Sequence, residues 1–163
     1  LLMMPGQVCY EPVIQLFGEW IVKEDGSLDR ETISKIVFEK KEILEKLNAI
    51  IHPAVKKYIL REIERSKKEK TEFFFIEAAL LIEEKYDEIC DELWYIYCEK
   101  EVRMERLRHN RGYSDKKIEQ MLKNQLSDEE FESKCDFQLY NSEDVAHTYL
   151  QIERKMRTYY ESM

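Results

Sequence analysis

The chain has 163 residues, a length typical of one domain, and 44% of them are hydrophobic, enough to build a folded core. Its net charge of −8 argues against nucleic acid as the main partner, because a phosphate backbone is bound by a basic face. No apolar run approaches the roughly 20 residues that a membrane-spanning helix requires, so we expect no membrane association.

The cysteines form no C-x-x-C pair and no Cys/His cluster with the spacing of metal ligands. They are Cys9, Cys90, Cys98 and Cys135. We therefore expect four free thiols, no metal bound by them, and a reducing, cytoplasmic location. The sequence does not indicate an oligomeric state.

Helices are predicted to dominate the first seventy residues, where apolar side chains recur at helical spacing. The expected helices span 10–17, 29–39 and 41–51, with another beginning at 55. Gly18 should end the first of them, and Asp29 should cap the second. Pro53 should end or kink the third, because proline lacks the N–H of a helical hydrogen bond.

Strands are predicted only after residue 70. Residues 71–76 form an aromatic run bounded by charges, which is typical of a buried strand, and 93–97 and 137–139 are the next candidates. Helices are expected at 102–108, at 114–126, after the Ser127 capping box, and over a final apolar stripe. That stripe consists of Val145, Tyr149, Ile152, Met156 and Tyr159. Strands separated by helices indicate an α/β fold with a parallel sheet.

Three features could carry chemistry, and each has a structural alternative. His52 could contact a phosphate or hydroxyl, or merely interact with the last carbonyls of its helix. Arg103, Arg106, Arg108 and Arg111 could bind phosphate, or form surface ion pairs with neighbouring glutamates. Glu77 follows the first predicted strand, at the end of a strand where α/β proteins bind ligands. There its carboxylate could hold magnesium through water, whereas the structural alternative is that Glu77 caps a helix.

Five segments of the chain match motifs that follow one another in a known family. They are Gly18 with 25–30 (F-G…D-G-x-L-x-R), 47–53 (L-N-x-x-x-H-P), 79–83 (P-L-L-F-E, here Ala-Leu-Leu-Ile-Glu), 106–125 (R-L-x-x-R-x-x-x-S…Q) and 136–141 (D-x-x-I-x-N). Taken in this order, they together resemble the dephospho-coenzyme A kinase family of phosphate-binding-loop kinases. Each segment alone is weak, but five in register over nearly the whole chain are specific.

The resemblance implies an α/β, three-layer parallel-sheet fold of the nucleotide-kinase type with a helical substrate domain and a lid. The implied parts are a substrate-side region at 1–70, core strands at 71–99, lid helices at 100–127, and a core strand with the C-terminal helix at 128–163. The implied reaction is ATP-dependent phosphorylation of the ribose 3′-hydroxyl of dephospho-coenzyme A, the last step of coenzyme A biosynthesis, with Mg²⁺ on the ATP.

The resemblance also implies roles for individual residues. Arg106 and Arg111 in the lid would be catalytic, although the second lid arginine of the family aligns nearer Asn110. The substrate-binding residues would be His52, Glu77 and Leu80, and the nucleotide-binding residues would be Arg106, Arg108 and Asn141. No metal ligand is assigned.

One departure from the family is large: no G-x-x-x-x-G-K-[ST] loop occurs in the sequence. We expect this loop, the first strand and the catalytic aspartate to precede Leu1 in a longer parent protein, and the 163 residues to be inactive alone. Another small-molecule, nucleoside or nucleotide kinase of the same fold is one alternative. A non-catalytic helical binding fragment, with the arginines as a solvated face, is another.

Overall fold

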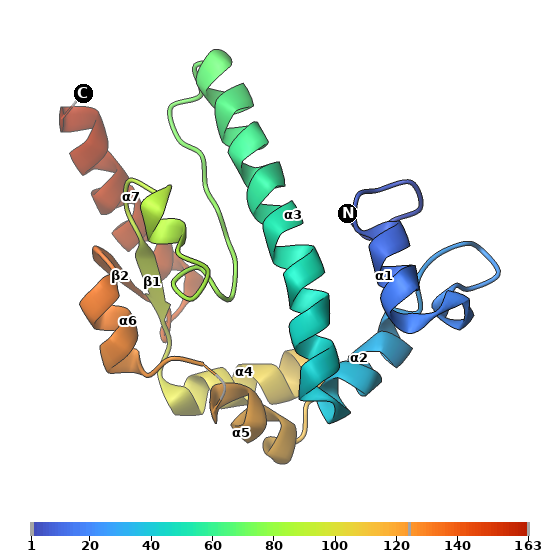
Figure 1. Cartoon of the computed structure of the whole chain (residues 1–163). Helices are drawn as coiled ribbons and strands as arrows, with labels where there is room; N and C mark the ends of the chain where they lie inside the picture. Colours follow the sequence, from blue (N-terminus) through green and yellow to red (C-terminus); the bar gives the residue numbers. More distant parts are fainter. Residues whose placement is uncertain (1, 124, 163) are drawn as a thin grey trace. The chain divides into compact units, whose positions relative to one another are not determined.

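The computed structural model describes residues 2–123 and 125–162 (Figure 1). Contacts divide the chain into two compact units, Leu1–Glu77 and Ala78–Met163, which are described separately below. Every helix in the described part of the chain is too short or too polar to cross a membrane. Asn124, which belongs to the predicted lid segment, lies outside the described residues.

The first unit is helical, as predicted. It contains α1 (Tyr10–Phe17), the short turn η1 (Glu19–Ile21), α2 (Arg30–Glu39) and α3 (Lys41–Lys68). Gly18 ends α1 with a φ of 96°, a conformation that glycine adopts without strain. Asp29 caps α2, because its Oδ1 accepts a hydrogen bond from the Thr32 amide at 3.2 Å. Both helix ends predicted from the sequence are therefore confirmed.

The core of this unit lies between α1, the turn after it, and α3. The buried side chains are Cys9, Tyr10, Val13, Ile21, Leu28 and Ile33. From α3, partly buried Leu47, Ile50, Ile51 and Ala54 pack against them. The Tyr10 hydroxyl donates to the Gly26 carbonyl at 2.6 Å and so fixes the predicted 25–27 turn against α1.

Of the two outcomes expected at Pro53, an end or a kink of the helix, the end is wrong, since α3 continues through this residue to Lys68. A proline removes one N–H from the helix, whereas the other residues of α3 keep theirs. The stretches 41–51 and from 55 onward, predicted as two helices, are thus one helix of 28 residues.

The second unit combines helices with a small parallel sheet. Its elements are η2 (Tyr86–Glu88), β1 (Trp94–Tyr97), α4 (Lys100–Arg111), α5 (Asp115–Lys123), α6 (Asp128–Lys134), β2 (Phe137–Tyr140) and α7 (Val145–Ser162). In the sheet, Trp94 lies opposite Phe137 and Tyr97 opposite Tyr140. Both pairs are edge-to-face, with ring centroids 4.9 and 5.5 Å apart. These cross-strand aromatic pairs stabilise the register, and the predicted parallel α/β arrangement is confirmed.

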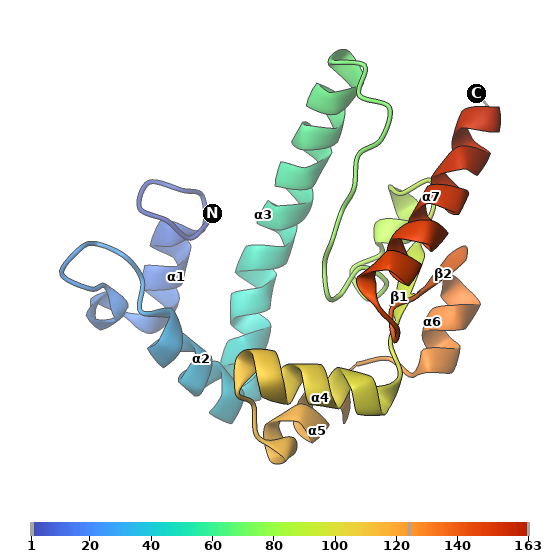
Figure 2. The ribbon, with the colours of Figure 1, turned by 180° about the vertical axis from the view of Figure 1, so that it is seen from behind.

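Helices α6 and α7 both pack on this sheet (Figure 2). The Phe131 ring of α6 stacks on the buried Tyr95 of β1, with centroids 4.8 Å apart. The Gln151 side chain of α7 accepts from the Tyr140 amide at 3.0 Å and donates to the Tyr140 carbonyl at 2.8 Å. One glutamine therefore satisfies both outward-facing backbone groups of Tyr140.

The apolar stripe of α7 is only partly covered. Ile152, Met156 and Tyr159 are half-buried, whereas Val145 and Tyr149 are 69% and 67% exposed. At the preceding helix, the predicted Ser127 capping box is confirmed: its side chain accepts from the Glu130 amide, and the Glu130 carboxylate accepts from the Ser127 amide.

Residues 71–76 do not form the predicted strand. They are extended without strand pairing, and Phe75 is 70% exposed. An aromatic composition favours a strand only where a neighbour supplies hydrogen-bond partners, and the sheet of the described residues consists of β1 and β2. Glu77 consequently follows an extended segment rather than the carboxyl end of a strand.

Candidate functional site

The carboxyl ends of β1 and β2 lie at one edge of the sheet, because the two strands are parallel. The Asn141 amide donates to the Tyr97 carbonyl at 2.8 Å, which continues the pairing one residue beyond β2. Ligands of α/β proteins bind outside the carboxyl ends of such strands. The candidate site is therefore the region where the chain leaves this edge, at Cys98 and at residues 141–143.

Arg106 of α4 directs its guanidinium at residues 141–143. Its Nη1 donates to the Asn141 carbonyl at 2.5 Å, and its Nη2 donates to the Glu143 carbonyl at 3.0 Å. The Ser142 carbonyl lies 3.5 Å from Nη2, and the Cys98 sulfur lies 3.7 Å from Nη1. The structure thus joins two predicted site residues, Arg106 and Asn141, through the backbone of the loop.

The same loop is held from both of its neighbouring helices. At the start of α4, the Glu99 amide donates to the Ser142 hydroxyl at 2.8 Å. From α7, the Thr148 hydroxyl lies 3.2 Å from Asn141 Oδ1. Burial, followed by the charge of Asp128, raises the pKa of the Tyr97 phenol above its usual value.

The other arginines of α4 have different surroundings. Arg108 forms an ion pair with Asp115 at 2.5 Å across the turn that joins α4 to α5. Arg111 is the last residue of α4 and is exposed, next to Gly112, whose φ is 63°. The Nε atom of Arg103 is buried and has no hydrogen-bond partner among the residues that the structure describes. The ion pair of Arg108 thus differs from the expected pairs with glutamates of its own helix.

His52 lies in the interior of α3 and is half-buried. The alternative that His52 interacts with terminal carbonyls does not hold, because α3 extends to Lys68. Glu77 is exposed, and Leu80 is 40% exposed at the start of a turn in which its carbonyl accepts from the Glu84 amide at 3.0 Å.

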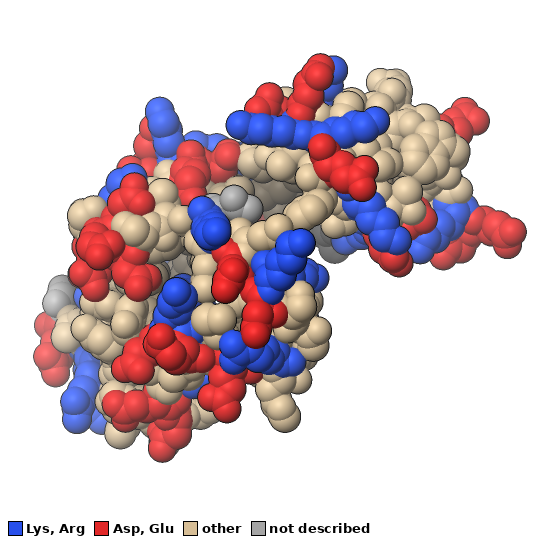
Figure 3. Space-filling model, turned by 90° about the horizontal axis from the view of Figure 1, so that it is seen from below, with Lys and Arg blue, Asp and Glu red and all other residues tan. Residues whose placement is uncertain are grey.

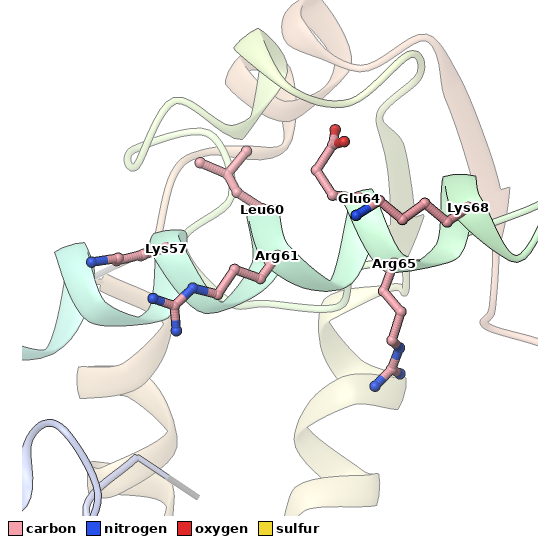
Figure 4. A pocket seen from close by; sticks show the side chains of 6 residues that line it. All are labelled: Lys57, Leu60, Arg61, Glu64, Arg65 and Lys68. Atoms are coloured by element: carbon pink, nitrogen blue, oxygen red, sulfur yellow. The ribbon is translucent and has the colours of Figure 1, made fainter.

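A shallow groove follows α3 beyond His52 (Figure 4). It is lined by Lys57, Leu60, Arg61, Glu64, Arg65 and Lys68. Figure 4 shows Arg61 and Arg65 on one side of the helix and Leu60 and Glu64 on the other. Arg65 is paired with Glu62 at 2.7 Å, so part of the positive charge of the groove is already balanced.

The roles of Cys98, Ser142 and Glu143 could not be predicted from the sequence. Two of them contribute backbone carbonyls, which every residue carries and no motif distinguishes. The signal in the sequence that pointed to this loop was the neighbouring segment 136–141, which resembles the family motif D-x-x-I-x-N.

Known proteins resemble this chain both in sequence and in fold. The model of the dephospho-CoA kinase family matches residues 1–147. The chain belongs to the dephospho-CoA kinase family. A dephospho-CoA kinase of Fusobacterium nucleatum is 34% identical over 148 residues, which cover 91% of this chain and 75% of the relative.

Solved structures have the same fold. A crystal structure from Thermus thermophilus superposes with a TM-score of 0.74 at 24% identity, covering 91% of this chain and 75% of that one. The dephospho-CoA kinase from Campylobacter jejuni superposes with a TM-score of 0.64 at 25% identity, covering 91% and 74%. The predicted nucleotide-kinase-like class of the chain is thereby confirmed.

Membership of the dephospho-CoA kinase family makes the chain a phosphotransferase of coenzyme A biosynthesis, with ATP as the phosphate donor. Acidic and basic side chains are interspersed on the face that Figure 3 shows, so any anion site there is local. Arg106, Arg108 and Arg111 of α4 are the cationic side chains for which the family resemblance suggests contact with ATP.

The described residues hold no group of three or more His, Cys, Asp or Glu that could bind a metal ion. Mg²⁺ in kinases is generally held by phosphates and one or two carboxylates. Glu77 is the exposed carboxylate that the sequence suggested for such a contact. When bound, the ion would offset charge on the phosphates.

Proposed function

We propose that the protein transfers the γ-phosphate of ATP to the ribose 3′-hydroxyl of dephospho-coenzyme A, with Mg²⁺ on the nucleotide, in the cytoplasm. The observation that supports it most directly is the ordered loop at the carboxyl edge of β1 and β2. There Asn141 lies within reach of the lid through Arg106. This edge is where a parallel sheet binds a nucleotide.

On the ATP side, the proposal assigns the loop at Asn141 to the adenine and the lid arginines to the phosphates. Arg108 and Arg111 lie at the end of α4, where a closing lid would bring them to ATP. The Arg108–Asp115 pair is solvent-exposed and therefore weak, so a phosphate can replace the carboxylate at small cost. Planar guanidinium groups stabilise the charge of the transferred phosphoryl group.

On the acceptor side, the proposal assigns His52, Glu77 and Leu80 to dephospho-coenzyme A. A half-buried imidazole can donate to or accept from a ribose hydroxyl or a phosphate. An exposed leucine offers apolar surface for the uncharged part of the substrate, and a carboxylate suits its hydroxyl groups.

The test is an activity assay on the protein expressed from its complete coding sequence. ADP release is followed with dephospho-coenzyme A, adenosine or AMP as acceptor, and the product is checked for a new 3′-phosphate. We expect turnover with dephospho-coenzyme A and at least about a hundredfold lower kcat/KM with the other two. Turnover on adenosine or AMP alone would instead support a nucleoside or nucleotide kinase.

A variant pair tests the acceptor side. We expect His52→Ala to raise the KM for dephospho-coenzyme A about tenfold, with the KM for ATP unchanged, because one charged or polar contact is lost. Lys46→Ala on the same helix is the control, since Lys46 is exposed and forms an ion pair with Glu42 at 3.1 Å. Equal effects of the two variants would remove His52 from the site.

A further inference from the structure

Arg106 directs both terminal nitrogens of its guanidinium at protein groups. Nη1 reaches the Asn141 carbonyl and the Cys98 sulfur, and Nη2 reaches the carbonyls of Glu143 and Ser142. The guanidinium has five N–H donors, four of them on these two nitrogens. A phosphate could bind these nitrogens only by displacing the carbonyls or the more distant Cys98 sulfur.

Three consecutive carbonyl oxygens converge on this one cation. Carbonyl oxygens carry partial negative charge, so a loop that turns three of them to one side needs a positive group between them. The side chain of Arg106 is half-buried, so these charge-assisted bonds are screened less than those of an exposed pair. The conformation of residues 141–143 therefore depends on Arg106.

We propose that Arg106 is a positioning residue: it sets the backbone of residues 141–143 so that the loop accepts the nucleotide base, and it does not itself bind the phosphates. This inference rests on the proposed nucleotide role of Asn141. It replaces the phosphate contact that the family resemblance suggested for Arg106 and leaves that contact to Arg108 and Arg111.

The proposal predicts how a mutant loses affinity. Arg106→Lys keeps the positive charge but offers one donor nitrogen, which cannot reach all three carbonyls together. A disturbed base loop weakens ATP, ADP and AMP by the same factor, because all three carry the same base. A lost phosphate contact weakens ATP most and AMP least.

The experiment measures the dissociation constants of ATP, ADP and AMP for the wild type and Arg106→Lys, with protein from the complete coding sequence. We expect an equal loss for all three, of about tenfold, and a kcat at saturating ATP within about twofold of wild type. Arg157→Lys is the control: Arg157 is exposed on α7 and pairs with Glu153 at 2.6 Å. We expect no change in its dissociation constants.

Amide hydrogen exchange supplies an independent measurement. The Asn141 amide is bonded to the Tyr97 carbonyl, and its protection should fall in Arg106→Lys but not in Arg157→Lys. A loss of affinity that increases with the number of phosphates, or unchanged protection at Asn141, would overturn the positioning role of Arg106 but leave the proposed function standing. A wild type that binds none of the three nucleotides would instead overturn the proposed function, and with it the role of the loop.

Discussion

The Glu92→Gln substitution tests how β1 is attached to α7. Glu92 precedes β1, and its Oε1 accepts from Lys155 Nζ at 2.7 Å and from the Trp94 indole N–H at 3.0 Å. Its Oε2 accepts from the Tyr159 hydroxyl at 2.5 Å. Glutamine has nearly the same shape but no charge, and it offers only one acceptor oxygen.

The size of the effect follows from the exposure of the pair. The side chains of Glu92 and Lys155 are 21% and 22% exposed, so water screens their attraction only in part. Hydrogen bonds to charged groups contribute about 1.5–3 kcal/mol each, and partial screening places the loss near the lower end. We therefore expect a destabilisation of about 2 kcal/mol, equal to about 1 M in the urea midpoint.

The loss should depend on pH in a defined way. Burial by itself raises the pKa of Glu92, but the hydrogen bonds from Lys155 and Tyr159 outweigh it and leave the pKa lowered. A lowered carboxylate pKa stabilises the fold above the unfolded value of about 4.3 and ceases to do so as the pH falls through the folded value. The hydrogen bond to Glu92 raises the pKa of Lys155, whose contribution is lost only as the pH rises above about 10.4.

Urea unfolding of both proteins at pH 7, 5 and 3, followed by circular dichroism, measures this difference. Glu153→Gln is the matched control, because Glu153 is 57% exposed and its pair with Arg157 should contribute at most about 0.5 kcal/mol. Equal effects of the two substitutions at pH 7 would refute the reasoning. So would a Glu92→Gln difference that stays constant down to pH 3.

Two further predictions concern stability. Gly18→Ala should lower the free energy of unfolding by about 2 kcal/mol, since Gly18 has a φ of 96° and an added Cβ would lie 2.9 Å from the Trp20 side chain. Gly6→Ala is the control and should cost about 1 kcal/mol, because Gly6 has a φ of 77° but open space around it. Equal losses in the two variants would show that the contact with Trp20 contributes nothing. Tyr95→Phe removes a hydrogen bond of 2.6 Å to Asp128 and should lower the free energy of unfolding by about 1 kcal/mol in urea titration, whereas an unchanged midpoint would mean that water replaces this bond.

Local signals predicted the local structure well. Gly18 and Asp29 bound helices because a glycine with positive φ and a carboxylate cap act on their immediate neighbours. The strand expected at 71–76 failed for the opposite reason, since a strand is stabilised by partners distant in sequence. The helix does not end at Pro53 because the cost of one missing N–H is offset by the packing of the rest of α3 on the core of the first unit.

In the candidate site too, some residues could be predicted from the sequence and others could not. Asn141 could be found from the sequence, because residues 136–141 resemble a motif of the family (D-x-x-I-x-N). The partners of Arg106 could not, because they are backbone carbonyls 35 to 37 residues away along the chain. Helical spacing shows which arginines share a face, but not what that face meets.

The parallel pairing of β1 with β2 also bears on how this family can change in evolution. The two strands are joined by the whole segment that carries α4, α5 and α6. The entropy cost of closing such a connection grows only logarithmically, by about 0.6 kcal/mol for each doubling of its length. Insertions within the connection should hardly affect the sheet, whereas a shift in strand register would separate both aromatic pairs. Lid length can therefore vary among relatives, provided that α4 and the loop after β2 stay in contact.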